Sequence, residues 1–170
     1  IADIYKALNI VEHGQLIEVD RSGLIGKYQG ETELKTKEII ESAKGGILFI
    51  DEAYTLSQSE NDYGQRAIEV LLKEMEDNRN DFVVIAAGYT DQMNSFLQSN
   101  PGLASRFGRV IKFEDYSPCE LYEIMIKYSK EYGYELESTS KNILIDYFSE
   151  AVKKPHFANG RFVRLLIETC

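Results

Sequence analysis

The sequence predicts an α/β fold, in which a parallel β-sheet with helices is followed by a small helical subdomain. Two continuous apolar runs, ILFI at 47–50 and FVVIAA at 82–87, have the length and composition of fully buried strands. Segments with apolar residues three and four positions apart lie between and after these runs. Buried strands that alternate with helices indicate a parallel sheet covered on both faces. Because only helices are expected after the last strand, we divide the chain into an α/β core, residues 1–115, and a helical subdomain, residues 116–170.

Local patterns predict the elements of the first half of the core. Apolar residues on one helical face at the start of the chain indicate the end of a helix, and three glycines within 23–31 indicate a loop. The charged segment that follows fits an exposed helix, which Gly45 and Gly46 end, since glycine is favoured just after a helix. In chain order we expect a helix ending near residue 8, a strand at 16–19, the glycine loop, a helix at 31–44 and the strand at 47–50.

The second half of the core begins with the strongest amphipathic pattern in the chain, formed by Ile68, Leu71, Leu72 and Met75. The elements expected from there are this helix, the strand at 82–87, a short helix around 93–97 and a last strand at 109–114. The subdomain then opens with a capping box, in which Ser117 and Glu120 flank a proline at the first helical position. Its expected helices cover residues 118–131, 139–152 and 160–169.

Composition limits the kinds of partner and setting. The 170 residues include 19 Lys and Arg against 28 Asp and Glu, so the net charge is −9. Surfaces that bind nucleic acid or anionic membranes need clustered cations, so we expect no membrane partner and disfavour nucleic acid. Cys119 and Cys170 lie far apart without metal-ligand spacing, which favours a reducing, cytoplasmic setting. No apolar run approaches the ~18 residues of a membrane span.

Asp51 and Glu52 follow the buried strand at 47–50 directly. Parallel α/β sheets bind ligands at the carboxyl ends of their strands. An aspartate placed there can hold Mg²⁺ through water, and an adjacent glutamate can act as a general base for attack on a phosphate. The alternative is that both acids cap the next turn or pair with surface lysines, and the two acids alone do not decide between these interpretations.

Three arginines are candidates for phosphate contacts. Arg106 and Arg109 precede the last predicted strand, where they could reach a phosphate on a neighbouring subunit and stabilise charge in the transition state. Arg161 opens the last helix, whose N-terminal dipole would add to its attraction for phosphate. The alternative for each arginine is a solvated surface residue or an ion pair.

Lys27 and Tyr28 lie between glycines in the sequence GKYQG. An exposed tyrosine beside a lysine can hold a polypeptide by packing and by hydrogen bonding. The alternative is a tyrosine that packs back onto its own domain.

Taken together, these segments resemble an AAA+ ATPase along the whole chain. The matching segments are ILFIDEA for the Walker B strand, VVIAAGYTD for the sensor 1 strand, SRFGR for the arginine finger, NGRFVR for sensor 2 and LIGKYQGET for the first pore loop. The closer similarity is to the CbbX/SpoVK group, which contains red-type Rubisco activase and stage V sporulation protein K. The residues that suggest this group are HGQLIEVDRSGLIGKYQGET, GGILFIDEAYTL, DYGQRAIEVLLKEMEDNRNDF, AGYTDQM, SNPGLASRF and HFANGRFVR.

The resemblance implies a role for each candidate around the nucleotide, ATP. Asp51 would bind Mg²⁺ through water and Glu52 would activate the attacking water. Arg106 would be the arginine finger, with Arg109 as a second candidate, and Arg161 would contact the phosphates from the helical lid, residues 116–170. These assignments follow from the resemblance and not from the spacing of the residues.

The resemblance also implies a protein substrate and a ring of subunits, a hexamer in the full protein. Lys27, Tyr28 and Gln29 would line a central pore and engage that substrate. Many AAA+ proteins have asparagine at sensor 1, whereas this segment offers Tyr89 or Thr90.

The phosphate-binding loop GxxxxGK[ST] is absent from the sequence. Gly26-Lys27 is followed by Tyr28 and so lacks the Ser or Thr that binds Mg²⁺. In the family this loop lies upstream of the helix that ends near residue 8, so the resemblance implies an AAA+ core whose first strand and P-loop precede this chain. That strand would lie between those at 82–87 and 109–114, which without it lose hydrogen-bond partners. Because the phosphate-binding loop is absent, we expect the chain alone to bind ATP poorly and to hydrolyse it negligibly.

The leading hypothesis is an enzyme, a ring-forming ATPase that remodels a protein partner. The alternative is a non-catalytic AAA+-like interaction module in which the two acids are structural. A DNA-directed ATPase is a third possibility, which the net charge of −9 and the aromatic loop disfavour. A composition rich in Lys, Ile and Asn favours the sporulation branch over Rubisco activation.

Overall fold

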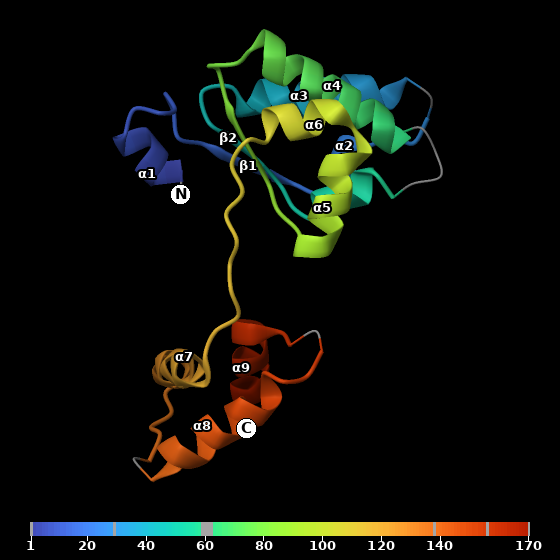
Figure 1. The fold of residues 1–170 in the computed structure, drawn as a ribbon. Helices are drawn as coiled ribbons and strands as arrows, with labels where there is room; N and C mark the ends of the chain where they lie inside the picture. The colour runs from blue at the N-terminus through green and yellow to red at the C-terminus, as the bar shows by residue number, and fades with distance from the viewer. Residues whose placement is uncertain (1, 29, 59–62, 138, 156, 170) are drawn as a thin grey trace. The chain divides into compact units, whose positions relative to one another are not determined.

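A computed structural model of the chain describes residues 2–28, 30–58, 63–137, 139–155 and 157–169. It divides into two compact units, Ile1–Ile111 and Lys112–Cys170, each of which is described by itself (Figure 1). Within the described residues, no helix combines the length and the apolar character needed to cross a lipid bilayer.

The first unit contains a parallel sheet of three strands, β1 (Leu16–Val19), β2 (Ile47–Ile50) and β3 (Val83–Ala86), in the order β1-β2-β3. Leu16 lies opposite Ile47, which lies opposite Val83. The strands predicted at 16–19, 47–50 and 82–87 are thus confirmed, and their carboxyl ends share one edge of the sheet. The central strand is the most buried, as its unbroken apolar sequence predicts.

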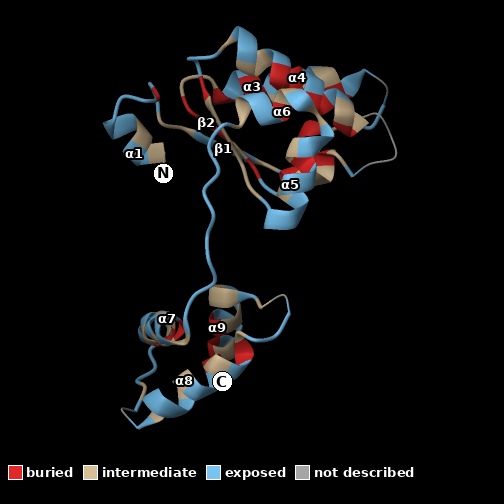
Figure 2. Ribbon diagram, in the orientation of Figure 1, coloured by how far each residue is buried: buried red, intermediate tan, exposed pale blue. Residues whose placement is uncertain are grey.

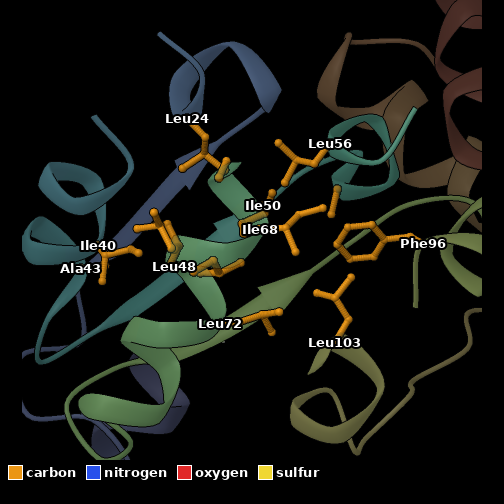
Figure 3. Packing of buried hydrophobic residues seen from close by; sticks show 14 of the residues in the cluster. Leu24, Ile40, Ala43, Leu48, Ile50, Leu56, Ile68, Leu72, Phe96 and Leu103 are labelled. Atoms are coloured by element: carbon orange, nitrogen blue, oxygen red, sulfur yellow. The ribbon is translucent and has the colours of Figure 1, made fainter. Parts of the chain in front are cut away.

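The helices of this unit are α1 (Ala2–Ala7), α2 (Arg21–Leu24), α3 (Glu31–Ala43), the 3-10 helix η1 (Ala53–Leu56), α4 (Tyr63–Asp77), α5 (Thr90–Ser99) and α6 (Pro101–Arg106). Side chains from α3, α4, α5 and α6 gather on Leu48 and Ile50 of the central strand (Figure 3). The labelled members of this cluster are Leu24, Ile40, Ala43, Leu48, Ile50, Leu56, Ile68, Leu72, Phe96 and Leu103.

Only one face of the sheet is fully packed. On the face of Leu48 and Ile50, their register partners on β3, Val84 and Ala86, also contact the core cluster. On the other face Leu16 is about half exposed, at 49%, and Val83 and Ile85 are partly exposed. Ile47, at the centre of that face, is fully buried, so the face is covered at its centre and only partly at its outer strands.

The strand predicted at 109–114 is also not formed. The whole of 108–117 is exposed and irregular, and Val110, Ile111 and Phe113 are 77%, 72% and 88% exposed (Figure 2). A β-strand exists only when a neighbour pairs with its backbone groups, and among the described residues none pairs with this segment. The division between the units falls inside it, whereas the sequence places the boundary at 115 and 116.

The second unit consists of the three predicted helices, α7 (Pro118–Glu131), α8 (Ser140–Ala151) and α9 (Asn159–Glu168). Its own small core contains Leu121, Met125, Phe148, Val163 and Ile167. The predicted capping box is present. The Ser117 hydroxyl accepts a hydrogen bond from the Glu120 amide at 3.3 Å, and the Glu120 carboxylate accepts one from the Ser117 amide at 2.8 Å.

Candidate functional site

A cleft of about 710 Å³ lies at the carboxyl ends of β1 and β2. Its walls come from the residues after β1, from the start of α3 and from the turn after β2. The lining residues are Asp20, Arg21, Ser22, Ile25, Gly26, Lys27, Glu31, Lys35, Glu52 and Thr55. This is the edge at which the sequence predicts a ligand, and the cleft brings Glu52 and Lys27 to one place.

Asp51 and Glu52 are held by the turn that leaves β2. The Asp51 amide donates to the Val19 carbonyl at 2.8 Å, and the Glu52 amide donates to the Asp51 carboxylate at 3.0 Å. Glu52 has a left-handed backbone, with φ 47° and ψ 42°, which is uncommon for a residue other than glycine. Its carbonyl accepts from both the amide and the hydroxyl of Thr55, at 2.9 and 2.8 Å, which stabilises that conformation.

Both acid side chains are exposed, and within the described parts of the chain neither forms an ion pair with a lysine or arginine. The lysine-pairing interpretation therefore has no support here. Asp51 does accept a bond from the next amide, so part of its capacity is used within the turn.

Tyr54 is a neighbour of Glu52 that the sequence did not single out. Its pKa is raised above the ordinary value, first by burial and then by the charge of Glu52 and a hydrogen bond to that carboxylate. The Tyr54 ring packs against Tyr89, with ring centroids 6.4 Å apart. A Cβ atom on Gly88 would lie 2.7 Å from the Tyr54 ring, so a glycine is needed there. The sequence signal that could have identified Tyr54 is its position two residues after Glu52, within the same turn.

The two sensor 1 candidates lie after β3. Tyr89 is 65% exposed and precedes α5, of which Thr90 is the first residue. Through its contact with Tyr54, Tyr89 belongs to the neighbourhood of Glu52. No such contact connects Thr90 to the acids among the described residues.

The arginine candidates are not part of the cleft lining. Arg106 ends α6, and its guanidinium lies 3.1 Å from the Glu76 carboxylate of α4. Its side chain is 27% exposed, and its Nε atom is buried without a hydrogen-bond partner in the described parts of the chain. Arg109 lies in the exposed segment 108–117 and forms no ion pair in the part of the chain that the structure describes. Arg161 is exposed in the first turn of α9, in the second unit.

Lys27 and Tyr28 are both exposed, Tyr28 by 70%, so Tyr28 does not pack back onto its own domain. Their backbone amides donate to the Glu31 carboxylate at 3.0 and 3.1 Å. The third predicted loop residue, Gln29, lies outside the described residues.

The acids fit Mg²⁺ by the chemistry of their oxygen donors. Among the described residues, no group of three or more His, Cys, Asp or Glu is arranged to hold a metal by itself. Mg²⁺ usually keeps several waters and binds through one or two carboxylates plus substrate phosphates. An exposed Asp51 beside Glu52 matches that type of site and not a closed protein cage.

Comparison with known proteins gives matches to both units. The family model described as "ATPase family associated with various cellular activities (AAA)" matches residues 3–115, and the model described as "AAA lid domain" matches residues 117–170. A CfxQ homolog from Galdieria sulphuraria is 48% identical over 170 residues, which cover 99% of this chain and 56% of that protein.

Two further relatives have more specific names. Protein CbbX from Cereibacter sphaeroides is 46% identical over 166 residues, covering 96% of this chain and 54% of that protein. The chloroplastic ribulose bisphosphate carboxylase/oxygenase activase from Cyanidioschyzon merolae is 45% identical over 166 residues, covering 96% of this chain and 57% of that protein. The chain thus spans a little over half the length of these relatives.

Proposed function

Because the chain belongs to the AAA family of ATPases, we propose that its parent protein hydrolyses ATP to remodel a protein partner. The observation that carries this proposal is the pair of exposed acids at the carboxyl end of the central strand. Glu52 faces a cleft there and has no lysine or arginine partner among the residues that the structure describes. The proposal applies to the parent protein, since we expect the chain alone, without a GxxxxGK[ST] loop, to bind ATP poorly.

In the proposed reaction Asp51 holds Mg²⁺ through water, and the ion neutralises phosphate charge when it is bound. Glu52 accepts a proton from the water that attacks the terminal phosphate. Tyr54 supports this role, because its hydroxyl donates to the Glu52 carboxylate and restricts its orientation. Tyr89 packs on Tyr54 and is the better supported of the two sensor 1 candidates, ahead of Thr90.

We assign the arginines to the phosphates by similarity to the family. Arg106, with Arg109 as the second candidate, would act on ATP bound by a neighbouring subunit of a hexamer, and Arg161 would act from the lid. Arg106 is bound to Glu76 of its own subunit, so this ion pair would have to open before the guanidinium reaches a neighbour.

The proposed partner is ribulose bisphosphate carboxylase/oxygenase, engaged by Lys27, Tyr28 and Gln29 at a central pore. Support comes from relatives between 44% and 49% identical, one of which is named as an activase of that enzyme. The sporulation role favoured by composition receives no support from these relatives. A cytoplasmic location stays a prediction, and the activase relative is described as chloroplastic.

The test is steady-state ATP hydrolysis by the protein extended upstream through its phosphate-binding loop. We expect Glu52→Gln to reduce turnover by about a hundredfold or more while ATP still binds, because the substitution removes the proposed general base. Glu38→Gln is the matched control, since Glu38 is exposed on α3 and lies outside the cleft lining. If the folded, extended protein does not hydrolyse ATP in any oligomeric state, the non-catalytic interaction module becomes the better explanation.

A further inference from the structure

Side chains in the first two turns of α3 form six hydrogen bonds with the backbone of residues 22–28. The Glu31 carboxylate accepts from the amides of Lys27 and Tyr28, and the Thr32 hydroxyl accepts from the Gly26 amide at 3.0 Å. Two further α3 side chains donate to carbonyls of this segment. They are Lys35, which donates to Ser22 at 2.7 Å and Ile25 at 3.1 Å, and Thr36, which donates to Leu24 at 3.0 Å.

These four α3 residues form one continuous face, which we call the anchor face: Glu31, Thr32, Lys35 and Thr36. Positions one, four and five apart lie on the same side of an α-helix, so the sequence spacing itself produces the face. Thr32 and Thr36 are buried, at 1% and 0% exposure, and each hydroxyl has a loop partner. The Lys35 ammonium binds two carbonyls, although a surface lysine is ordinarily solvated.

Gly26 lies directly against this face. A Cβ atom there would overlap the Glu31 Cβ and would lie 2.8 Å from both the Glu31 carbonyl carbon and the Thr32 amide nitrogen. Only a residue without a side chain lets the loop backbone approach α3 this closely. The glycine and the anchor face therefore fit each other.

The Lys27 and Tyr28 side chains of this loop are exposed, whereas Leu24 of the same segment is buried. Tyr28 is 70% exposed and Lys27 is exposed, although the amide of each is bound to Glu31. A backbone that is already fixed loses less conformational entropy when its side chains bind a partner. The loop also shares its cleft with Glu52 and Thr55, so the anchored segment lies beside the proposed general base.

We propose that Glu31 and Lys35 are positioning residues that hold Tyr28 and Lys27 ready for a polypeptide partner. This inference rests on the proposed function, because it concerns the loop that engages that partner. A purely structural role is the competing explanation, in which Glu31 only satisfies amides that precede a helix. The two explanations differ in what happens to partner affinity when the carboxylate is removed.

The experiment compares Glu31→Ala, Glu31→Gln and Glu33→Ala in the protein extended through its phosphate-binding loop. Glu33→Ala is the matched control, because Glu33 is two residues away on α3 but pairs with Lys37 and Arg66 and not with the loop. The first readout is amide hydrogen exchange of the peptide that contains residues 26–28. The second is the half-saturating concentration of ribulose bisphosphate carboxylase/oxygenase for stimulating ATP hydrolysis, read separately from the maximal rate.

We expect Glu31→Ala to speed exchange at Lys27 and Tyr28 about tenfold or more, since two charge-assisted hydrogen bonds are lost. We expect the half-saturating partner concentration to rise at least about fivefold, with a smaller change in maximal rate. Glu31→Gln keeps a carbonyl acceptor, so its exchange rate and half-saturating concentration should stay close to those of wild type. Lys35→Met keeps the apolar part of the side chain but removes the ammonium that binds the Ser22 and Ile25 carbonyls, so the loop should exchange faster.

With Glu31→Ala, two results would overturn the inference: unchanged exchange, or faster exchange with an unchanged half-saturating concentration. The first means that Glu31 does not hold the loop, and the second means that the anchor is structural only. If the wild-type protein hydrolyses ATP but is not stimulated by the probe, the proposed partner is wrong and the inference falls with it. The exchange readout does not depend on hydrolysis, so a failure of the anchor is distinguishable from a failure of the proposed function.

Discussion

Glu52 shows how one backbone conformation places the side chain that we propose as the general base. A left-handed residue between β2 and η1 turns the chain sharply, so the carboxylate faces a cleft instead of following the strand direction. Such conformations cost energy outside glycine and persist only where neighbours stabilise them, here through Thr55. Tyr54 forms a hydrogen bond with the Glu52 carboxylate. Thr55 therefore stabilises the backbone of Glu52, and Tyr54 orients its side chain.

Tyr54→Phe tests this arrangement. The substitution keeps the ring that packs on Tyr89 and removes only the hydroxyl that donates to Glu52. In the extended protein we expect the maximal rate of ATP hydrolysis to fall about tenfold, as is typical when a group that orients a reactive residue is lost. ATP affinity should change little, because Tyr54 is not a proposed ligand. Tyr134→Phe is the control, since Tyr134 is half exposed in the second unit. An unchanged maximal rate would show that Glu52 needs no orientation by Tyr54.

Elements whose signals are local could be predicted from the sequence. The strands at 16–19 and 47–50 and the helices of the second unit follow from apolar runs and capping residues, which depend on near neighbours only. The segment 109–114, RVIKFE, also has residues favoured in strands but no pairing partner among the described residues, and pairing is not a local property. Helix α6 was missed although its signals were present. Asn100 accepts from the Gly102 amide at 2.8 Å, and Pro101 occupies the first helical position.

The candidate site, like the fold, could be predicted where the signal lies in neighbouring residues. Asp51 and Glu52 became candidates because they directly follow a buried strand, and the structure places Glu52 in the cleft lining and Tyr28 in an exposed position. Tyr54 and the anchor face were missed because both depend on contacts across a turn or between a helix and a loop. These contacts can be identified only in the folded structure. For example, no sequence pattern indicates that the Gly26 amide donates a hydrogen bond to the Thr32 hydroxyl.

The capping box of α7 predicts a pH-dependent stability of the second unit. Hydrogen bonds from the Ser117 amide and hydroxyl hold the pKa of Glu120 below its ordinary value. A carboxylate whose pKa is lower in the folded state contributes stability that is complete above the unfolded pKa and is lost as pH falls through the folded pKa. The contribution should therefore be full at neutral pH, should begin to fall near the ordinary pKa of glutamate and should be lost as the pH falls through the lowered folded pKa.

Thermal unfolding followed by helical circular dichroism measures this effect. Between pH 6 and pH 3 we expect wild type to lose more stability than Glu120→Gln, whose neutral amide does not titrate. Glu123→Gln is the control, because Glu123 is exposed on the same helix but lies outside the capping box. Equal losses in wild type and Glu120→Gln would mean that the capping carboxylate contributes nothing to the acid sensitivity.

The sheet of the first unit predicts how the whole chain behaves alone in solution. Both outer strands have an unpaired edge among the described residues, but the two edges differ in sequence. Strand β1 carries the charged Glu18, and charges on an edge strand discourage pairing with other chains. Strand β3, with the sequence VVIA, has no charge, and its residues Val83 and Ile85 are partly exposed on the loosely covered face. The exposed residues Val110, Ile111 and Phe113 add further apolar surface in this chain.

We therefore expect the 170-residue chain to self-associate with increasing concentration, through the edge of β3. Ile85→Lys should shift the association to at least about tenfold higher concentration, because it places a charge on that edge strand while the core-facing residues Val84 and Ala86 stay unchanged. Leu16→Lys is the matched control, since it places the same charge on β1, the other edge strand. Sedimentation velocity over a range of concentrations separates the outcomes. A chain that stays monomeric throughout, or one that Leu16→Lys and Ile85→Lys affect equally, would mean that the β3 edge is not the associating surface.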